Sequence, residues 1–275
     1  MRPKYLLFLI LPALFFSCKK EKGIVDQPPP EVKPPVALLK DVVSSNLPSP
    51  YYHFEYNADS SISFVSFAAD FTKYEVHYTA GRISDMTSDI LGTSEKLQYF
   101  YDNSGRVIAV NYFDVTGAVY IKVSFTYDGT KLVKLERQRR LGSDFVLNKA
   151  MSFSYYSDGN LKEIIDHRPA VPGRQDESTT SDKFDQYDNK INVDGFALIH
   201  NDFFDHLVLL PGVQFQKNNP GKEILTSDGT SFEVNYTYTY NGKSLPLLKQ
   251  GEGIITSGPS AGQTFQANSN YSYYE

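Results

Sequence analysis

Residues 100–112 read FYDNSGRVIAVNY, and phrases of the same kind recur along the chain. In each phrase a lead tyrosine is followed by turn-forming residues and then by an aliphatic residue four to six positions on. Successive lead tyrosines lie 22, 23, 26, 29, 31 and 53 residues apart, so the repeat lacks the fixed period of a solenoid or a propeller. The seven lead residues are Tyr56, Tyr78, Tyr101, Tyr127, Tyr156, Tyr187 and Tyr240.

Each phrase predicts a β-hairpin. Alternating apolar and polar residues lead into Asp, Asn and Gly, which tolerate the positive φ of a tight turn, and a second apolar segment follows. The clearest case runs from Val123 to Tyr127, turns at Asp128-Gly129 and leaves through Leu132 to Leu135.

The second strand of each hairpin carries apolar pairs three residues apart, such as Val107/Val110 and Leu132/Leu135. Plain alternation would place such a pair on opposite faces of a sheet. Three-residue spacing also suits a helix, but the flanking turns and the aromatic, β-branched composition favour strands. Either a β-bulge returns both residues to one face, or the sheet is apolar on parts of both faces.

About seven hairpins predict an all-β domain over residues 38–275, built as an antiparallel meander of 12 to 14 strands. So long a sheet must curl or close, so we expect a strongly curved sheet or a barrel of soluble type, with a helical stretch near Asp194 to Leu210. Lys, Glu and Arg interrupt the strands, as in Lys131 to Arg140, which disfavours a membrane-spanning barrel.

The N-terminus carries Arg2 and Lys4, then 12 apolar residues from Tyr5 to Phe16, then Ser17-Cys18. This pattern resembles a bacterial lipoprotein signal peptide with its lipobox, which implies removal of residues 1–17 and lipid attachment at Cys18. Twelve apolar residues are too few to span a bilayer core of about 30 Å. The alternatives are a cleaved signal peptide with an incidental cysteine, or a buried cysteine in a cytosolic protein.

Residues 18–37 are expected to form a lipid-anchored tether, because five of the chain's 15 prolines lie between Pro28 and Pro35. Cys18 is the only cysteine, so the mature chain has neither disulfides nor a thiol for catalysis. Loss of residues 1–17 removes two positive charges and no acidic ones, which takes the net charge from −5 to −7. A mildly acidic domain without a basic block is a poor nucleic-acid binder.

Four groups of residues raise the question of chemistry. Residues 258–262 match the G-x-S-x-G pattern of hydrolases, but a strand follows where that motif needs a helix, and no histidine lies after His206. His200 and His206, with Asp202 and Asp205, have a spacing that fits zinc poorly. The basic group Arg137, Arg139 and Arg140 suits phosphate or an acidic glycan less well than an exposed turn. Asp176 and Glu177 lie in a Ser/Thr-rich loop without a calcium-binding pattern.

The Tyr-Asp-x-x-Gly phrase resembles the YD repeats of large bacterial surface proteins. The lipobox, the repeated hairpins, the passage Lys183 to Pro220 and the strand with Tyr236, Tyr238 and Tyr240 resemble a family of Bacteroidota lipoproteins of unknown function. At Tyr187 the chain departs from that family's pattern, with Ile191-Asn192 where Asn-Pro is typical. The resemblance implies a porin-like fold and an outer-membrane location, and it implies no activity.

From these features we expect a lipid-anchored envelope protein, on the periplasmic or cell-surface face of the outer membrane, that is not an enzyme. A binding module for a glycan, peptide or protein partner fits best, because tyrosines offer area and a hydrogen-bonding tip if they are exposed. No catalytic residue, metal ligand or cofactor is expected, and no ligand-binding residue is assigned. The alternatives are an assembly lipoprotein without a small ligand and, less well supported, an envelope hydrolase.

Overall fold

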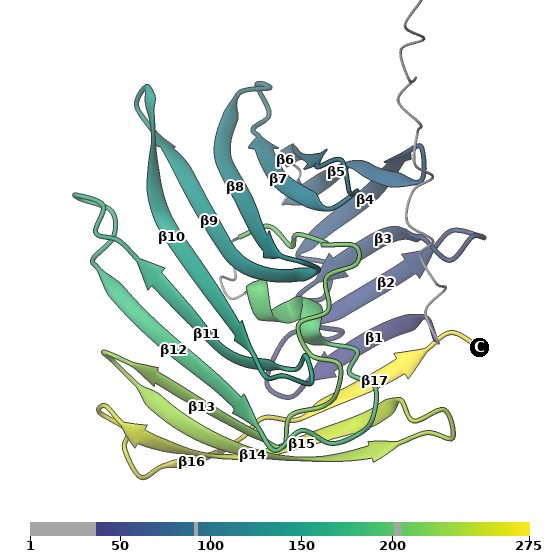
Figure 1. Cartoon of the computed structure of the whole chain (residues 1–275), viewed down its shortest axis with the longest axis vertical. Coiled ribbons are helices and arrows are strands. Elements are labelled where there is room, and N and C mark those ends of the chain that lie inside the picture. Colours follow the sequence, from purple (N-terminus) through teal and green to yellow (C-terminus); the bar gives the residue numbers. More distant parts are fainter. Residues whose placement is uncertain (1–36, 91–92, 201–204) are drawn as a thin grey trace, which may run out of the picture. The chain divides into compact units, whose positions relative to one another are not determined.

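The computed structural model describes residues 37–90, 93–200 and 205–275, which form one sheet of 17 antiparallel strands (Figure 1). One short 3-10 helix, η1, spans Gly195–Ile199. The strands are β1 Leu39–Ser44, β2 Tyr52–Tyr56, β3 Ile62–Phe67, β4 Thr72–Thr79, β5 Arg82–Ile90, β6 Thr93–Tyr101, β7 Val107–Phe113, β8 Val119–Asp128, β9 Lys131–Leu141, β10 Asp144–Tyr155, β11 Leu161–Arg168, β12 Ser178–Asp185, β13 Lys222–Ser227, β14 Ser231–Tyr240, β15 Pro246–Ser257, β16 Thr264–Gln266 and β17 Ser269–Tyr273.

The sheet is closed into a barrel. Each strand from β1 to β15 pairs with the next, and β1 also pairs with β17, which pairs in turn with β15. β16 and β17 pair with successive parts of β15, so they occupy one position in a ring of 16 strands. The predicted antiparallel meander is therefore confirmed, and of the two expected forms it is the barrel.

The strand number exceeds the predicted 12 to 14. The tyrosine-led phrases account for 13 strands, from β2 to β12 together with β14 and β15. The remaining four, β1, β13, β16 and β17, adjoin turns that carry no such phrase. The phrase marks one class of hairpin turn, so strands joined by other turns escape it.

β-Bulges explain the three-residue spacing of the apolar pairs. At the Tyr101 hairpin, Tyr101 pairs with Val107 and Phe100 pairs with Ala109, so Ile108 is the extra residue. The bulge turns both Val107 and Val110 inward, and both are buried. Equivalent shifts occur at the hairpins that begin with Tyr56, Tyr78, Tyr127, Tyr155 and Tyr240.

Lead tyrosines also tie each hairpin to the one before it. The Tyr101 hydroxyl donates a hydrogen bond to the carbonyl of Ile83, the residue that pairs with the previous lead tyrosine. The same step, with oxygen–oxygen distances from 2.7 to 2.9 Å, joins Tyr78 to Ile62, Tyr127 to Val107, Tyr155 to Leu132 and Tyr187 to Leu161. In the fifth phrase the ladder therefore uses Tyr155, and the predicted lead residue Tyr156 is wrong by one position.

The aspartate that follows a lead tyrosine organises the turn. Asp102 Oδ1 accepts hydrogen bonds from the backbone N–H groups of Ser104 and Arg106, and Gly105 takes a φ of 81°. The Arg106 guanidinium binds Asp102 Oδ2 and lies 5.1 Å from the ring centre of Tyr127, the next lead tyrosine. The phrase thus encodes both a turn and a contact with the next hairpin.

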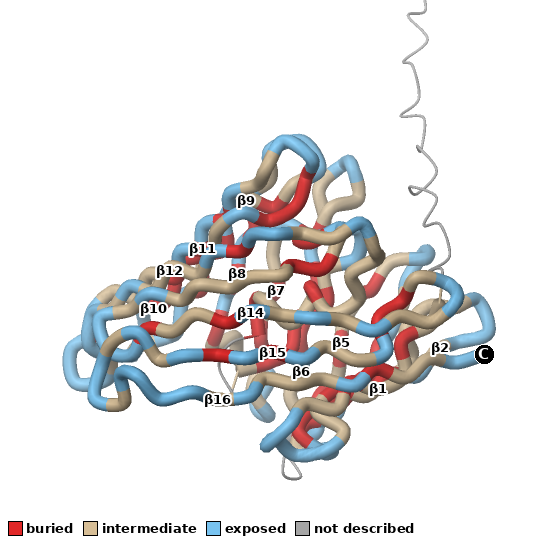
Figure 2. Tube along the Cα trace, turned by 90° about the horizontal axis from the view of Figure 1, so that it is seen from below, coloured by how far each residue is buried: buried red, intermediate tan, exposed pale blue. Residues whose placement is uncertain are grey.

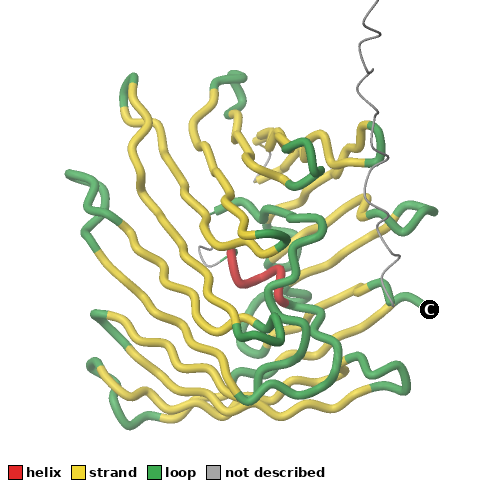
Figure 3. The backbone as a smooth tube through the Cα atoms, viewed as in Figure 1, coloured by secondary structure: helices red, strands yellow, loops and turns green. Residues whose placement is uncertain are grey.

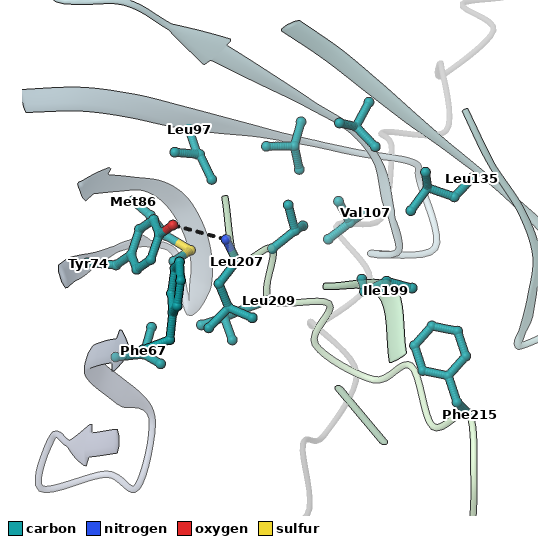
Figure 4. Close-up of a cluster of buried hydrophobic side chains, with 14 of the residues drawn as sticks. Phe67, Tyr74, Met86, Leu97, Val107, Leu135, Ile199, Leu207, Leu209 and Phe215 are labelled. Carbon is teal, nitrogen blue, oxygen red and sulfur yellow. Dashed lines mark hydrogen bonds between the residues drawn. The ribbon is translucent and has the colours of Figure 1, made fainter. Parts of the chain in front are cut away.

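The hydrophobic core lies inside the barrel. Along β4, Thr72, Tyr74 and Val76 are buried, whereas the alternate residues Lys73, Glu75 and His77 are exposed. Figure 2 shows the same change between buried and exposed residues along neighbouring strands. Inward side chains from the strands meet Ile199, Leu207, Leu209 and Phe215, which belong to the segment between β12 and β13 (Figure 4).

Within the described residues, no helix is both long and apolar enough to cross a bilayer. The predicted signal peptide of residues 1–17, the lipid-attachment residue Cys18 and almost all of the predicted tether lie outside the described residues.

Candidate functional site: the plugged lumen

The described residues 186–200 and 205–221 leave the wall after β12, lie in the lumen and return at β13; we call them the plug (Figure 3). At Tyr187 the sequence predicts an ordinary hairpin, which is wrong, because the chain turns inward instead. Asp188 Oδ1 accepts from Lys190 N, as in other phrases, but also from Asn219 N at the far end of the plug. The helix predicted for Asp194 to Leu210 is reduced to η1, and the rest of that stretch is irregular where described.

His206 is the centre of one group of contacts between the plug and the wall. Its side chain is 3% exposed. Its Nε2 lies 2.6 Å from Glu95 Oε2 on β6 and 2.9 Å from the Tyr120 hydroxyl on β8. Its Nδ1 lies 3.1 Å from the Tyr74 hydroxyl on β4, which also accepts from Leu207 N. One plug residue therefore joins three wall strands.

The protonation of this group follows from its partners. The hydrogen bond from His206, with a further one from Tyr120, lowers the pKa of Glu95 in spite of partial burial, so its carboxylate only accepts. His206 Nε2 then carries a proton and donates to Glu95. In the neutral imidazole, Nδ1 accepts from Tyr74, whose oxygen is satisfied by Leu207 N. Both ring nitrogens of His206, Glu95 Oε2 and the hydroxyls of Tyr74 and Tyr120 therefore each have a partner.

Further contacts join the plug to other parts of the wall. His200 Nδ1 lies 3.0 Å from the Tyr52 hydroxyl on β2, and Asp205 forms an ion pair with Arg137 on β9. On β17, two positions around the wall from β2, the Tyr271 hydroxyl donates to Asp194 Oδ2 at 2.6 Å. Burial acts to raise the pKa of Asp194, but the charge of Lys249 and the hydrogen bond from Tyr271 bring it below its ordinary value.

This geometry suits structural ties better than acid–base chemistry. Burial, and then the hydrogen bond to Glu95, raises the pKa of Tyr120, and burial raises that of Tyr74. Both phenols therefore keep their protons at neutral pH. Both ring nitrogens of His206 are engaged by the wall, which leaves no lone pair directed at a substrate.

The zinc arrangement that the sequence disfavours for His200, His206, Asp202 and Asp205 does not form from the described residues. His200 and His206 face different wall strands, and Asp205 is paired with Arg137; Asp202 lies outside the described residues. Across the described ranges, no group of three or more His, Cys, Asp or Glu side chains is placed to hold a metal ion.

Ser260 lies in the turn between β15 and β16, where its carbonyl accepts from Gln263 N. The G-x-S-x-G pattern is thus part of a hairpin, as the sequence indicated. The exposed turn predicted for Arg137, Arg139 and Arg140 is wrong, because all three lie on β9. Arg137 points inward and is 9% exposed, whereas Arg139 and Arg140 are exposed near the strand end.

Surface tyrosines were the expected basis for ligand contact, and most tyrosines instead have internal roles. Tyr74, Tyr99 and Tyr112 are buried in the core, and the ladder tyrosines are half-buried with hydroxyls bonded to carbonyls. Among the described tyrosines, Tyr274 alone is exposed on the surface, with an exposed fraction of 37%. Sequence reasoning also missed Glu95, although its position among inward-facing strand residues was a usable signal.

No protein-family model matches this sequence, and no curated protein matches it. Two solved structures are similar in fold: porin-like proteins from Bacteroides uniformis ATCC 8492 and Bacteroides vulgatus ATCC 8482. Each aligns with a TM-score of 0.55 and 14% sequence identity over 86% of this chain, and over 95% and 99% of the respective neighbour. The chain therefore has the fold of these porin-like proteins.

Proposed function

We propose that the protein is a lipid-anchored envelope protein whose barrel is a closed scaffold that binds a glycan, peptide or protein partner, without conducting solutes and without catalysis. The observation that supports this best is the filled lumen. Leu207 is fully buried there, and Leu209 and Phe215 pack against apolar wall residues. A water-filled pore would instead need a polar, unobstructed interior.

The outer face of the barrel supports a position beside the membrane. Outward residues of β4 include Lys73 and Glu75, and Lys122 of β8 is likewise exposed. A lipid-facing lysine near the bilayer midplane costs about 2 to 4 kcal/mol. Anchoring through acyl chains on Cys18 would hold such a barrel at a membrane that it does not cross.

The envelope location is supported by two independent features: the signal-like residues 1–17 with Cys18, and the fold shared with porin-like proteins of Bacteroides. Fractionation of cells that express wild-type and Cys18→Ser proteins tests the anchor. We expect the wild type in the outer-membrane fraction and the variant in the soluble fraction. Equal membrane association of both would overturn the anchor. Protease treatment of intact cells then reports which face of the membrane carries the barrel.

Conductance measurement tests the scaffold role directly. We expect purified protein added to planar lipid bilayers to give no stepwise current, whereas a general porin measured in parallel does. Reproducible single-channel steps would contradict the proposal. A glycan array probed with the Cys18→Ser protein then tests the binding role, and an array without any saturable signal would favour the assembly alternative.

A further inference from the structure

A basic hollow opens where the ends of β9 and β10 meet the loop that joins β11 to β12. It has a volume of about 80 Å³, and its lining includes Arg139, Arg140, Asn148, Val171, Arg174 and Gln175. A second hollow of about 390 Å³ adjoins it and shares Val171, Arg174 and Gln175, and its lining also includes Asp176. Arg139 and Arg140 thus line a surface hollow.

Arg139, Arg140 and Arg174 line this space. No carboxylate lines the smaller hollow. In the described part of the chain, none of Arg139, Arg140 and Arg174 has an acidic side chain within 4.0 Å, although Arg140 donates a hydrogen bond to the Val119 carbonyl at 3.3 Å. Like charges gathered in one place repel each other, so an anion that enters the hollow lowers the energy of the arrangement.

The loop that carries Arg174 is held in position. Val171 N and Arg174 N donate to the carbonyls of Gln175 and Val171, at 2.8 and 2.9 Å. Gln175 Nε2 donates to the Asn148 carbonyl on β10 at 2.9 Å and to the Pro169 carbonyl at 2.8 Å. These bonds fix the backbone at Arg174 beside the strand that pairs with Arg139 and Arg140. A fixed position reduces the entropy that binding must overcome.

We propose that this hollow binds a tetrahedral oxyanion, a phosphate or sulfate, either free or as an ester on a saccharide. Planar guanidinium groups bind such oxyanions through paired, charge-assisted hydrogen bonds. A space of about 80 Å³ suits the anionic group better than a whole sugar ring. The adjoining hollow offers room for the molecule that carries the group. This proposal names the chemical class of ligand for the binding function proposed above. It depends on that function only for its biological meaning.

Isothermal titration of the purified protein tests the site, with inorganic phosphate, sulfate, glucose 6-phosphate and glucose as probes. We expect saturable binding of the three anions, weakened by added salt, and none of glucose. Tighter binding of glucose 6-phosphate than of phosphate would indicate an esterified ligand, and equal binding a free anion. Absence of binding of all three anions at millimolar concentration overturns the site.

Arg139→Gln and Arg174→Gln should each weaken anion binding about tenfold or more, because each removes a charge-assisted contact. Lys162→Gln is the matched control: it removes one positive charge from the exposed side of β11, outside the hollow. Equal affinity in Arg174→Gln and Lys162→Gln overturns the site. Unchanged thermal unfolding shows that each variant is folded. Channel currents, or membrane association without Cys18, would overturn the proposed function but would leave anion binding unchanged. Failure of the proposed function and failure of the anion site can therefore be told apart.

Discussion

At the scale of single residues, the tyrosine of each repeated phrase has a defined mechanical role. Its hydroxyl donates a hydrogen bond to a carbonyl beside the β-bulge of the preceding hairpin. A phenylalanine would fill the same space but would leave that carbonyl without its donor. This explains why tyrosine recurs at these positions.

Tyr101→Phe tests that role. We expect the variant to lose about 0.5 to 1.5 kcal/mol of unfolding free energy, because one largely shielded hydrogen bond to the Ile83 carbonyl disappears. Urea unfolding measures the change. Tyr51→Phe is the control, since the half-buried Tyr51 hydroxyl makes no hydrogen bond to any described residue and its loss should be nearly neutral. Equal stability of the two variants would show that the ladder bond contributes nothing.

The ladder also gives stability a dependence on alkaline pH. Burial raises the pKa of both Tyr101 and Tyr127 from 10.0 to about 12. Between these values the folded state retains protons that the unfolded state releases, so stability falls as pH rises from 10 towards 12. We expect the urea midpoint to drop in that interval, and tyrosinate absorbance to rise with unfolding. Free titration of all tyrosines near pH 10 in the folded state would contradict this.

At the scale of elements, the sequence predicted the hairpins well and the plug poorly. Turn residues and alternation are local signals, so the strands around Tyr56, Tyr78, Tyr101 and Tyr127 could be found from them. The sequence left open whether bulges occur or the sheet is apolar on parts of both faces. That choice depends on which residues of neighbouring strands pair, and the alternation of apolar and polar residues does not reveal the pairing. The plug is set by contacts between distant residues, such as Asn219 with Asp188, which no local pattern reveals.

The plug's attachment can be tested at His206. We expect His206→Ala to cost about 2 to 4 kcal/mol, because it removes one hydrogen-bond partner each from Glu95 and Tyr74 and opens a cavity. His77→Ala, at an exposed position of β4, should change stability by less than about 0.5 kcal/mol. Denaturant unfolding compares the two, and similar costs would show that the His206 contacts carry no special weight.

The same variant has a pH signature. The hydrogen bond from His206 lowers the pKa of Glu95 below 4.5, so the wild type gains stability that is present above pH 4.5 and is lost as pH falls below it. His206→Ala should show less of this acid-dependent loss. A wild type and a variant with identical pH profiles would contradict the assigned contact.

At the scale of the whole barrel, the apolar and polar faces are arranged opposite to those of a spanning porin. Core residues such as Val65, Met86 and Leu97 point into the lumen, where the plug meets them, and charged residues lie on the outside. The repeat and the charges along β9 predicted a strongly curved sheet or a barrel that does not span a membrane, without deciding between the two forms. They could not show what fills the lumen, because curvature and closure decide how much space remains inside.

A pair of substitutions distinguishes a barrel with an apolar, plugged lumen from a membrane-spanning barrel with a water-filled lumen. We expect Leu207→Asp to cost more than about 3 kcal/mol or to prevent folding, since it places an unpaired charge at a fully buried position in the plug. Leu247→Asp, at a position on β15 that is 42% exposed, should change stability by less than about 0.5 kcal/mol. In a water-filled barrel crossing a bilayer the order would reverse, because the lumen would hydrate the first charge and lipid would oppose the second. Chemical denaturation of both variants in aqueous buffer and in lipid vesicles therefore decides which face of this barrel is its core.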